Sequence, residues 1–135
     1  MALQYSVAVR NAKLDAVETQ IGATAVLKLR TGAAPADCAT ADSGTVVASL
    51  TLPSDWMAAA SSGSKVKSGT WQDTSADNSG TIAHWRLYAS DGTTCGAQGT
   101  ATITTGGGDM ELDAVVVTAG QTITITAFTL TAGNA

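Results

Sequence analysis

The stretch Ala-Gly-Gln-Thr-Ile-Thr-Ile-Thr-Ala-Phe-Thr-Leu-Thr, residues 119–131, indicates the fold class of this chain. Threonine alternates with an apolar residue along most of it, which is the period of a β-strand with one buried and one solvated face. The phase then changes, because Ile123 and Ile125 keep one phase and Phe128 takes the other. We therefore predict either a β-bulge near Ala127–Phe128 or a strand that leaves one sheet and joins a second.

The composition of the whole chain agrees with a β-protein. Its 135 residues fit one domain. Charged residues make up 13% of the sequence, about half the usual share, and threonine, serine, alanine and glycine replace them. Such a composition favours strands and turns over a helical surface. The net charge of −4 comes without a basic stripe, so the sequence gives no reason to expect nucleic-acid binding.

One helix is expected near the start of the chain, over about residues 6–20, and Gly22 is well placed to end it. This helix could pack on the sheet of its own domain or dock on a neighbouring subunit. Residues 54–57 are expected to form a short helical turn capped by Ser54 or Asp55.

Alternating apolar residues mark further strands around this helix. In the first of them Lys28 and Arg30 are expected to face outward. The turn Ser90-Asp91-Gly92 predicts a hairpin between the two strands that flank it. The strands are expected near residues 25–30, 46–52, 66–71, 81–89, 98–104, 110–114 and 119–131.

Seven or eight short strands at these spacings are typical of a β-sandwich. We therefore predict a mainly β fold, a single β-sandwich of jelly-roll type with one N-terminal α-helix. Residues 1–22 would form an N-terminal helical arm, and residues 23–135 the β-sandwich domain.

Cys38 and Cys95 are the two cysteines of the chain, and they allow either one disulfide or two free thiols. The first residues lack the basic start and apolar centre of a signal peptide, and no apolar run approaches the roughly 20 residues that span a bilayer. We therefore expect a protein made and kept in a cytoplasm, with both thiols reduced.

Signals of catalysis are weak in this sequence. His84 is the one histidine, and no Gly-x-Ser-x-Gly motif or positioned carboxylate accompanies it. The triple glycine at residues 106–108 lacks the Gly-Lys-Ser/Thr ending of a phosphate-binding loop. It is better interpreted as a tight connection that uses the conformational freedom of glycine. We predict no catalytic residues and no cofactor.

Acidic residues could still indicate calcium, which prefers several oxygen ligands. Asp109, Glu111 and Asp113 alternate along one strand and should share a face. A solvated acidic face is the commoner meaning of such a row, and we predict no metal site. A second group of oxygen-bearing side chains, without the spacing of an EF-hand, consists of Asp73, Asp77 and Asn78.

The three tryptophans are expected to differ in role. Trp85 is in phase with Ala83 and Leu87 and should lie in the core. Trp56 and Trp71 flank a loop of small polar residues and are better candidates for a contact surface. Exposed indole rings would also suit a carbohydrate-binding site.

Five runs distributed over nearly the whole chain carry a further observation: RNAKLDAVE at 10–18, LRTGAAP at 29–35, LPSDWM at 52–57, AHWRLY at 83–88 and GGGDMEL at 106–112. Together they resemble a group of small structural proteins encoded among the virion genes of tailed bacteriophages. Such proteins are described as head decoration (cement) proteins or as tail-associated proteins, and they have no catalytic residues to carry over.

The resemblance implies a non-enzymatic capsid decoration (cement) protein that stabilises the phage head. Its expected partners are the major capsid protein or other virion proteins and further copies of itself, with no nucleic acid and no membrane. The expected location is the virion, assembled in the host bacterial cytoplasm. The alternatives are a tail or head–tail associated protein, or a carbohydrate- or receptor-binding module. The candidate interface side chains are Tyr5, Val9, Trp56, Trp71, His84, Arg86 and Tyr88.

Overall fold

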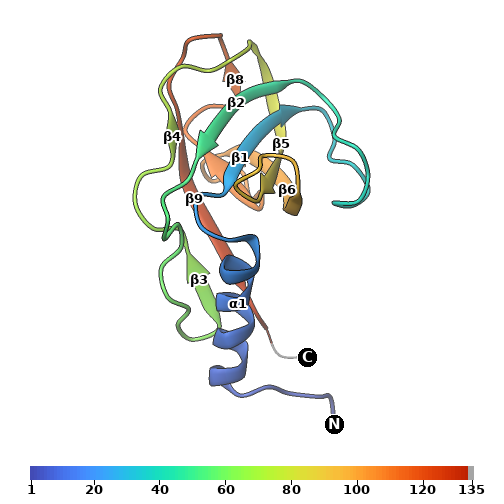
Figure 1. Ribbon diagram of the computed structural model, residues 1–135, viewed down its shortest axis with the longest axis vertical. Helices are drawn as coiled ribbons and strands as arrows, with labels where there is room; N and C mark the ends of the chain where they lie inside the picture. The colour runs from blue at the N-terminus through green and yellow to red at the C-terminus, as the bar shows by residue number, and fades with distance from the viewer. Residues whose placement is uncertain (134–135) are drawn as a thin grey trace.

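The computed structural model describes residues 1–133, so the last two residues of the predicted β-domain lie outside the described part. The protein is mainly β, with one helix and a curled open sheet (Figure 1). The described elements are α1 Val7–Ile21, β1 Val26–Thr31, β2 Val46–Thr51, β3 Ser64–Val66, β4 Gln72–Asp73, β5 Gly80–Tyr88, β6 Cys95–Ile103, β7 Met110–Leu112, β8 Val116–Val117 and β9 Ile123–Thr131.

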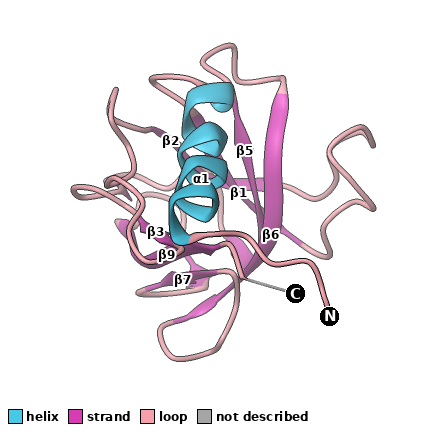
Figure 2. Ribbon diagram, turned by 90° about the horizontal axis from the view of Figure 1, so that it is seen from below, coloured by secondary structure: helices cyan, strands magenta, loops and turns pink. Residues whose placement is uncertain are grey.

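The strands form one sheet in the order β2-β1-β5-β6-β7-β9-β3, while β4 pairs with β9 and β8 pairs with β5. Every pairing is antiparallel except that of β6 with β7. The predicted hairpin is confirmed, because β5 and β6 pair across the turn at residues 90–92. The helix α1 lies at one end of the sheet, beside β3 (Figure 1), and is therefore nearest the viewer when the molecule is seen from below (Figure 2).

The core lies inside the curl of the sheet. Leu27 pairs with Leu87 and Leu29 with Trp85 across β1 and β5, and all four side chains are buried. The ring of Phe128 on β9 meets the ring of Trp85 edge to face, with centroids 5.2 Å apart. Each such side chain contributes about 1.5–3 kcal/mol through burial. Apolar contact therefore holds β5 and β9 together across the curl of the sheet.

The predicted bulge in the last strand is confirmed. Glu111 of β7 pairs with Ala127 of β9, but the next residue, Leu112, pairs with Ile125, so Thr126 is an extra residue in β9. A bulge of this kind shifts the side-chain alternation by one. Ile125 and Phe128 are therefore both buried although they differ in phase.

The helix begins and ends as the sequence indicates. The hydroxyl of Ser6 accepts a hydrogen bond from the Val9 amide, which caps the first turn, and Gly22 ends the helix with φ +95°. Leu14 and Ile21 are buried, and Ile21 belongs to the main core. The helix thus packs on the β-structure of its own chain.

Two expectations about local structure were wrong. The segment from Ser54 to Met57 forms no helical turn; Met57 instead forms an isolated β-bridge with Lys67. No continuous strand runs over residues 66–71, since β3 ends at Val66 and β4 begins at Gln72. Both short strands pair with the long strand β9, which determines where they form.

Candidate functional site

The segment 32–44 covers one face of β1, β5 and β6, and we call it the covering loop. It buries three of the candidate interface side chains, those of His84, Arg86 and Tyr88. The Arg86 Nη2 atom donates to the carbonyl oxygens of Asp37 (2.7 Å) and Thr40 (2.8 Å) in this loop. The expectation that these three side chains lie at an interface was therefore wrong, because the covering loop lies over them.

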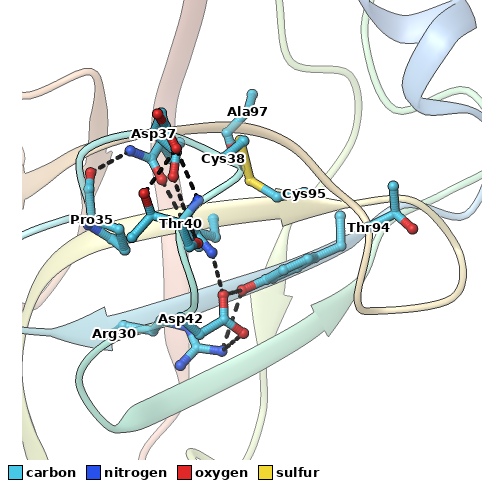
Figure 3. The surroundings of a disulfide bond; sticks show 12 residues. Arg30, Pro35, Asp37, Cys38, Thr40, Asp42, Thr94, Cys95 and Ala97 are labelled. Atoms are coloured by element: carbon cyan, nitrogen blue, oxygen red, sulfur yellow. Dashed lines mark hydrogen bonds and ion pairs between the residues drawn. A yellow bond between two sulfur atoms is a disulfide. The ribbon is translucent and has the colours of Figure 1, made fainter.

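Asp42 is the centre of the contacts beneath the covering loop (Figure 3). Its carboxylate accepts hydrogen bonds from Arg30 Nη2 at 2.9 Å and from the Tyr88 hydroxyl at 2.6 Å, and it also pairs with Arg86 Nη1. Arg30 is 6% exposed and Arg86 is 2% exposed, so the expectation that Arg30 faces solvent was wrong. Buried guanidinium groups need a counter-charge, and here one carboxylate forms an ion pair with each of two guanidinium groups.

The protonation states of this cluster follow from its contacts. Burial pushes the pKa of Asp42 upward, but hydrogen bonds from Tyr88 and Arg86 and the charge of Arg30 outweigh it, so that pKa lies below its usual value. Burial, followed by the hydrogen bond to Asp42, raises the pKa of Tyr88. At neutral pH the carboxylate is therefore charged and the phenol keeps its proton. This arrangement holds the covering loop on the sheet.

His84 lies on the same face of β5. Its Nδ1 atom is 2.7 Å from the carbonyl oxygen of Gly32, and its side chain is 1% exposed. No nucleophile or carboxylate is hydrogen-bonded to it within residues 1–133. A general base must reach its substrate, so this buried position supports a structural role.

A disulfide joins the covering loop to β6, between Cys38 and Cys95, whose Cα atoms are 5.3 Å apart (Figure 3). The expectation of two reduced thiols was wrong, because the fold brings together two residues that are 57 positions apart in the sequence. The Gln98 amide nitrogen, also on β6, donates to the Pro35 carbonyl oxygen at 2.6 Å. The loop is thus attached by a covalent bond, an ion-pair cluster and side-chain hydrogen bonds.

Trp56 and Trp71 were expected on a contact surface, and this expectation was wrong. They are 0% and 1% exposed, with ring centroids 6.1 Å apart. Their indole nitrogens donate to the carbonyl oxygens of Gly22 and Ser68, each at 3.0 Å. A chain with one phenylalanine and two tyrosines uses its tryptophans to fill the core, and neither ring is available to stack on a sugar.

A further buried charge, that of Lys65, holds the helix on the sheet. The Lys65 ammonium of β3 is 3% exposed and lies 2.7 Å from Asp15 Oδ1 and 3.0 Å from Glu18 Oε2 on α1. The same carboxylates accept hydrogen bonds from the amides of Ala60 and Met57. Burial works against the ammonium, but the hydrogen bonds that it donates to Asp15 and Glu18 outweigh this effect, so the pKa of Lys65 is raised. The helix is therefore tied to β3 by charge as well as by apolar packing.

Most of the carboxylates that could have bound calcium accept hydrogen bonds from the backbone instead. Asp109 Oδ2 accepts from the Thr100 amide at 2.9 Å, and Asp113 Oδ1 accepts from the Thr124 amide at 3.0 Å. Asp73 accepts from two amides in the same way. Within residues 1–133, no three side chains of the His, Cys, Asp or Glu type lie close enough to hold a metal ion.

Two of the candidate interface residues do lie at the surface. Tyr5 is 39% exposed and Val9 is 43% exposed. The Tyr5 ring lies beneath the Lys13 ammonium, which is 4.1 Å from the ring centroid. They belong to a longer group of exposed large apolar side chains, which comprises Met1, Leu3, Tyr5, Val7, Val9, Val66, Ile103 and Val116.

Sequence reasoning missed Asp42, Lys65 and the role of the covering loop. One signal was present, since Arg30 and Arg86 stand in strands of a chain with only seven basic residues. A charge in the middle of a buried strand requires a partner, and that requirement could have directed attention to the nearest acidic loop.

In comparisons with known proteins, the chain matches no protein-family model, no curated protein and no solved structure. Within the described residues, no helix has the length and apolar character needed to cross a membrane.

Proposed function

We propose that this chain is a non-enzymatic structural protein of a tailed-phage virion, a capsid decoration (cement) protein that stabilises the head by contacting neighbouring capsid subunits. One observation carries the proposal. The side chains of His84, Arg86 and Tyr88 are buried and bonded inside the fold, whereas large apolar side chains stay exposed, among them Leu3 at 67% and Val116 at 74%. Protein contact surfaces are built from exposed apolar side chains, and we infer that these side chains contribute to such a surface.

The chemistry of the buried groups supports the same proposal. An enzyme needs an accessible acid, base or nucleophile in a cleft. Here His84 lies beneath the covering loop, and the nearby carboxylate of Asp42 is held in ion pairs with two arginines. These groups stabilise a small domain, which is what a particle component requires.

The disulfide is also consistent with a virion protein. Disulfides persist in oxidising surroundings and are rare in reducing cytoplasm. A phage particle is assembled in a cytoplasm and then released, so Cys38 and Cys95 would pair at the latest after release. Their bond would hold the covering loop on the finished particle.

We also propose that the curled sheet is the two-layer sandwich of a jelly roll. In support of this, β9 packs across the core from β5 through Phe128 and Trp85. The Trp71 ring lies 5.6 Å from Phe128 on the same inner side. Two faces that share one apolar interior are the feature that sandwiches have in common.

Sedimentation with purified heads tests the proposed function. Heads from a phage that lacks the gene should bind the added protein in stoichiometric amounts and then survive a higher temperature before they release DNA. The double variant Ile103→Asp, Val116→Asp should bind less, because it places charges on exposed apolar positions. The variant Asp55→Asn, at an exposed polar position, is the matched control and should bind like the wild type.

Two results would contradict the proposal: a protein that stays in the supernatant, or heads whose stability does not change when the protein binds. Sedimentation with isolated tails, and not with heads, would indicate the tail-associated alternative.

A further inference from the structure

The disulfide attaches the middle of the covering loop to the sheet. The loop leaves the sheet where β1 ends at Thr31 and returns to it where β2 begins at Val46. Cys38 lies between these two ends, and its partner Cys95 is the first residue of β6 (Figure 3). The loop is therefore bonded covalently to the sheet at both ends and at one point between them.

Apolar packing contributes little to holding the covering loop. Within residues 32–44 no residue is buried, and none belongs to the hydrophobic core. The side chains of His84 and Arg86 beneath the loop alternate along β5 with those of Trp85 and Leu87 in the core, and alternate side chains of a strand point to opposite faces. Movement of the loop away from β5 would therefore leave the core covered.

The polar contacts of the covering loop offset only part of the cost of ordering it. Each ordered backbone residue costs about 1–2 kcal/mol of conformational entropy. A hydrogen bond returns about 0.5–1.5 kcal/mol net, or up to about 3 kcal/mol where a charged group takes part. The loop residues that contact the sheet are fewer than those that must be ordered, and they are Gly32, Pro35, Asp37, Thr40, Asp42 and Ser43. The disulfide lowers the ordering cost, because it restricts the conformations that an open loop could adopt.

Two buried polar atoms beneath the loop also favour its opening. Within residues 1–133, Arg30 Nε and His84 Nε2 have no hydrogen-bond partner. The two residues are 6% and 1% exposed and lie opposite each other on β1 and β5. A buried polar atom without a partner costs about 1–3 kcal/mol, and this cost disappears once water reaches the atom. Opening of the loop would hydrate both atoms.

We propose that the Cys38–Cys95 disulfide is a redox-sensitive latch on the covering loop. While the bond is intact, the loop stays closed over Arg30, His84 and Arg86. When the bond is reduced, the loop opens and these side chains meet solvent, while the sheet and its core stay folded. This inference goes beyond the proposed virion function and does not depend on it.

Reduction by a dithiol opens the latch through two exchange steps. Both cysteines are partly exposed, and Cys95 lines an open hollow of about 530 Å³ beside α1, so a small dithiol can reach the bond. One thiolate of the dithiol attacks a cysteine sulfur and displaces the other cysteine as a thiolate. The second thiol of the dithiol then displaces the first cysteine. Two electrons and two protons pass to the cysteines, and the dithiol leaves as a cyclic disulfide.

Exchange of the Arg86 guanidinium protons with water, measured by NMR, tests the latch in the full-length wild type. In the closed loop these protons are bonded to Asp42 and to the carbonyl oxygens of Asp37 and Thr40. Dithiothreitol should speed their exchange by at least about tenfold, because the open loop no longer protects them. Backbone amides of the β1–β5 pair should keep their rates. Reoxidation with glutathione disulfide should restore the slow exchange.

Nitration of tyrosine by tetranitromethane gives an independent measurement. The chain has two tyrosines, Tyr5 at 39% exposure and Tyr88 at 0%. Tyr5 should react in every sample, whereas Tyr88 should react in the double variant Cys38→Ser, Cys95→Ser and not in the oxidised wild type. Ser43→Ala is the matched control, because it removes the hydrogen bond to the Ala33 carbonyl within the loop and keeps the disulfide. Its Tyr88 should stay unreactive.

Three results would overturn the proposal. Unchanged Arg86 exchange on reduction, or an unreactive Tyr88 in the double serine variant, would show that polar contacts alone keep the loop closed. Faster exchange throughout the β1–β5 pair would show that the bond supports the whole sheet and not the loop in particular. A reactive Tyr88 in Ser43→Ala would show that the disulfide does not control opening. Head binding is measured separately, so its failure would refute the virion function and leave the latch.

Discussion

The carboxylate of Asp42 makes the most important electrostatic contacts among the side chains described above. It forms ion pairs with two guanidinium groups, those of Arg30 and Arg86, and neither residue is more than 6% exposed. The carboxylate itself is 40% exposed, so solvent screens part of the interaction. Its removal matters mainly because two buried charges would then lack a partner.

We predict that Asp42→Asn lowers the free energy of unfolding by about 3 kcal/mol, because the amide cannot balance the arginines. Urea unfolding followed by tryptophan fluorescence measures the change. Asp55→Asn removes an exposed carboxylate and should change stability by less than about 0.5 kcal/mol. Equal urea midpoints for the two variants would show that the ion-pair cluster adds no stability.

Asp91 in the β5–β6 turn provides a pH-dependent contribution. Hydrogen bonds from the Thr94 hydroxyl and then from the Thr94 and Thr93 amides lower its pKa from 3.8 to about 2. Because the folded-state pKa is depressed, the stabilisation is fully present above pH 3.8 and is lost as the pH falls toward 2. The melting temperature of Asp91→Ala should therefore lie below that of the wild type at pH 7, and the difference should shrink at pH 2. A difference that is the same at both pH values would contradict this account.

At the scale of the elements, local patterns predicted those parts whose contacts are close in sequence. The helix, with its end at Gly22, and the β5–β6 hairpin followed from short motifs. The bulge in β9 followed from a change of phase. Each of these is decided within a few residues, where the periodicity of helix or strand is the dominant signal.

The covering loop could not be predicted in this way. Its position depends on Arg86 and Cys95, which lie on strands far along the chain. The burial of Trp56 is similar, since it depends on a hydrogen bond to Gly22, 34 residues away. Alternation within a strand shows which residues share a face, but it does not show what covers that face.

The disulfide should be the strongest single attachment of the covering loop. Cross-linking residues 57 positions apart restricts the unfolded chain and is worth about 4 kcal/mol in the chain-entropy account. The double variant Cys38→Ser, Cys95→Ser should lose about this much free energy of unfolding in urea. Reductant should destabilise the wild type by a similar amount and leave the variant unchanged. A reductant effect on the variant would mean that something other than this bond responds.

At the scale of the whole molecule, a row of aromatic rings connects β5 with β9 and with the segment between β2 and β4. Trp56, Trp71, Phe128 and Trp85 follow one another with centroid distances of 6.1, 5.6 and 5.2 Å. The chain from β2 to β4 supplies the first two rings, β9 the third and β5 the last. Because the sheet is open, this row and its aliphatic neighbours hold the curl that forms the core.

Phe128 is the point at which this row can be broken with least other change, since it touches both Trp71 and Trp85. Phe128→Ala should lower the free energy of unfolding by about 3–5 kcal/mol, because it leaves a cavity between the rings of Trp71 and Trp85. Phe128→Leu keeps most of the volume and should cost less than about 1.5 kcal/mol. Ile103→Ala, at a 52% exposed position, is the surface control and should change stability little. Urea unfolding gives the three values, and near-ultraviolet circular dichroism reports the tryptophan packing. Equal losses for Ala and Leu would mean that the ring contacts, and not the filled volume, hold the curl.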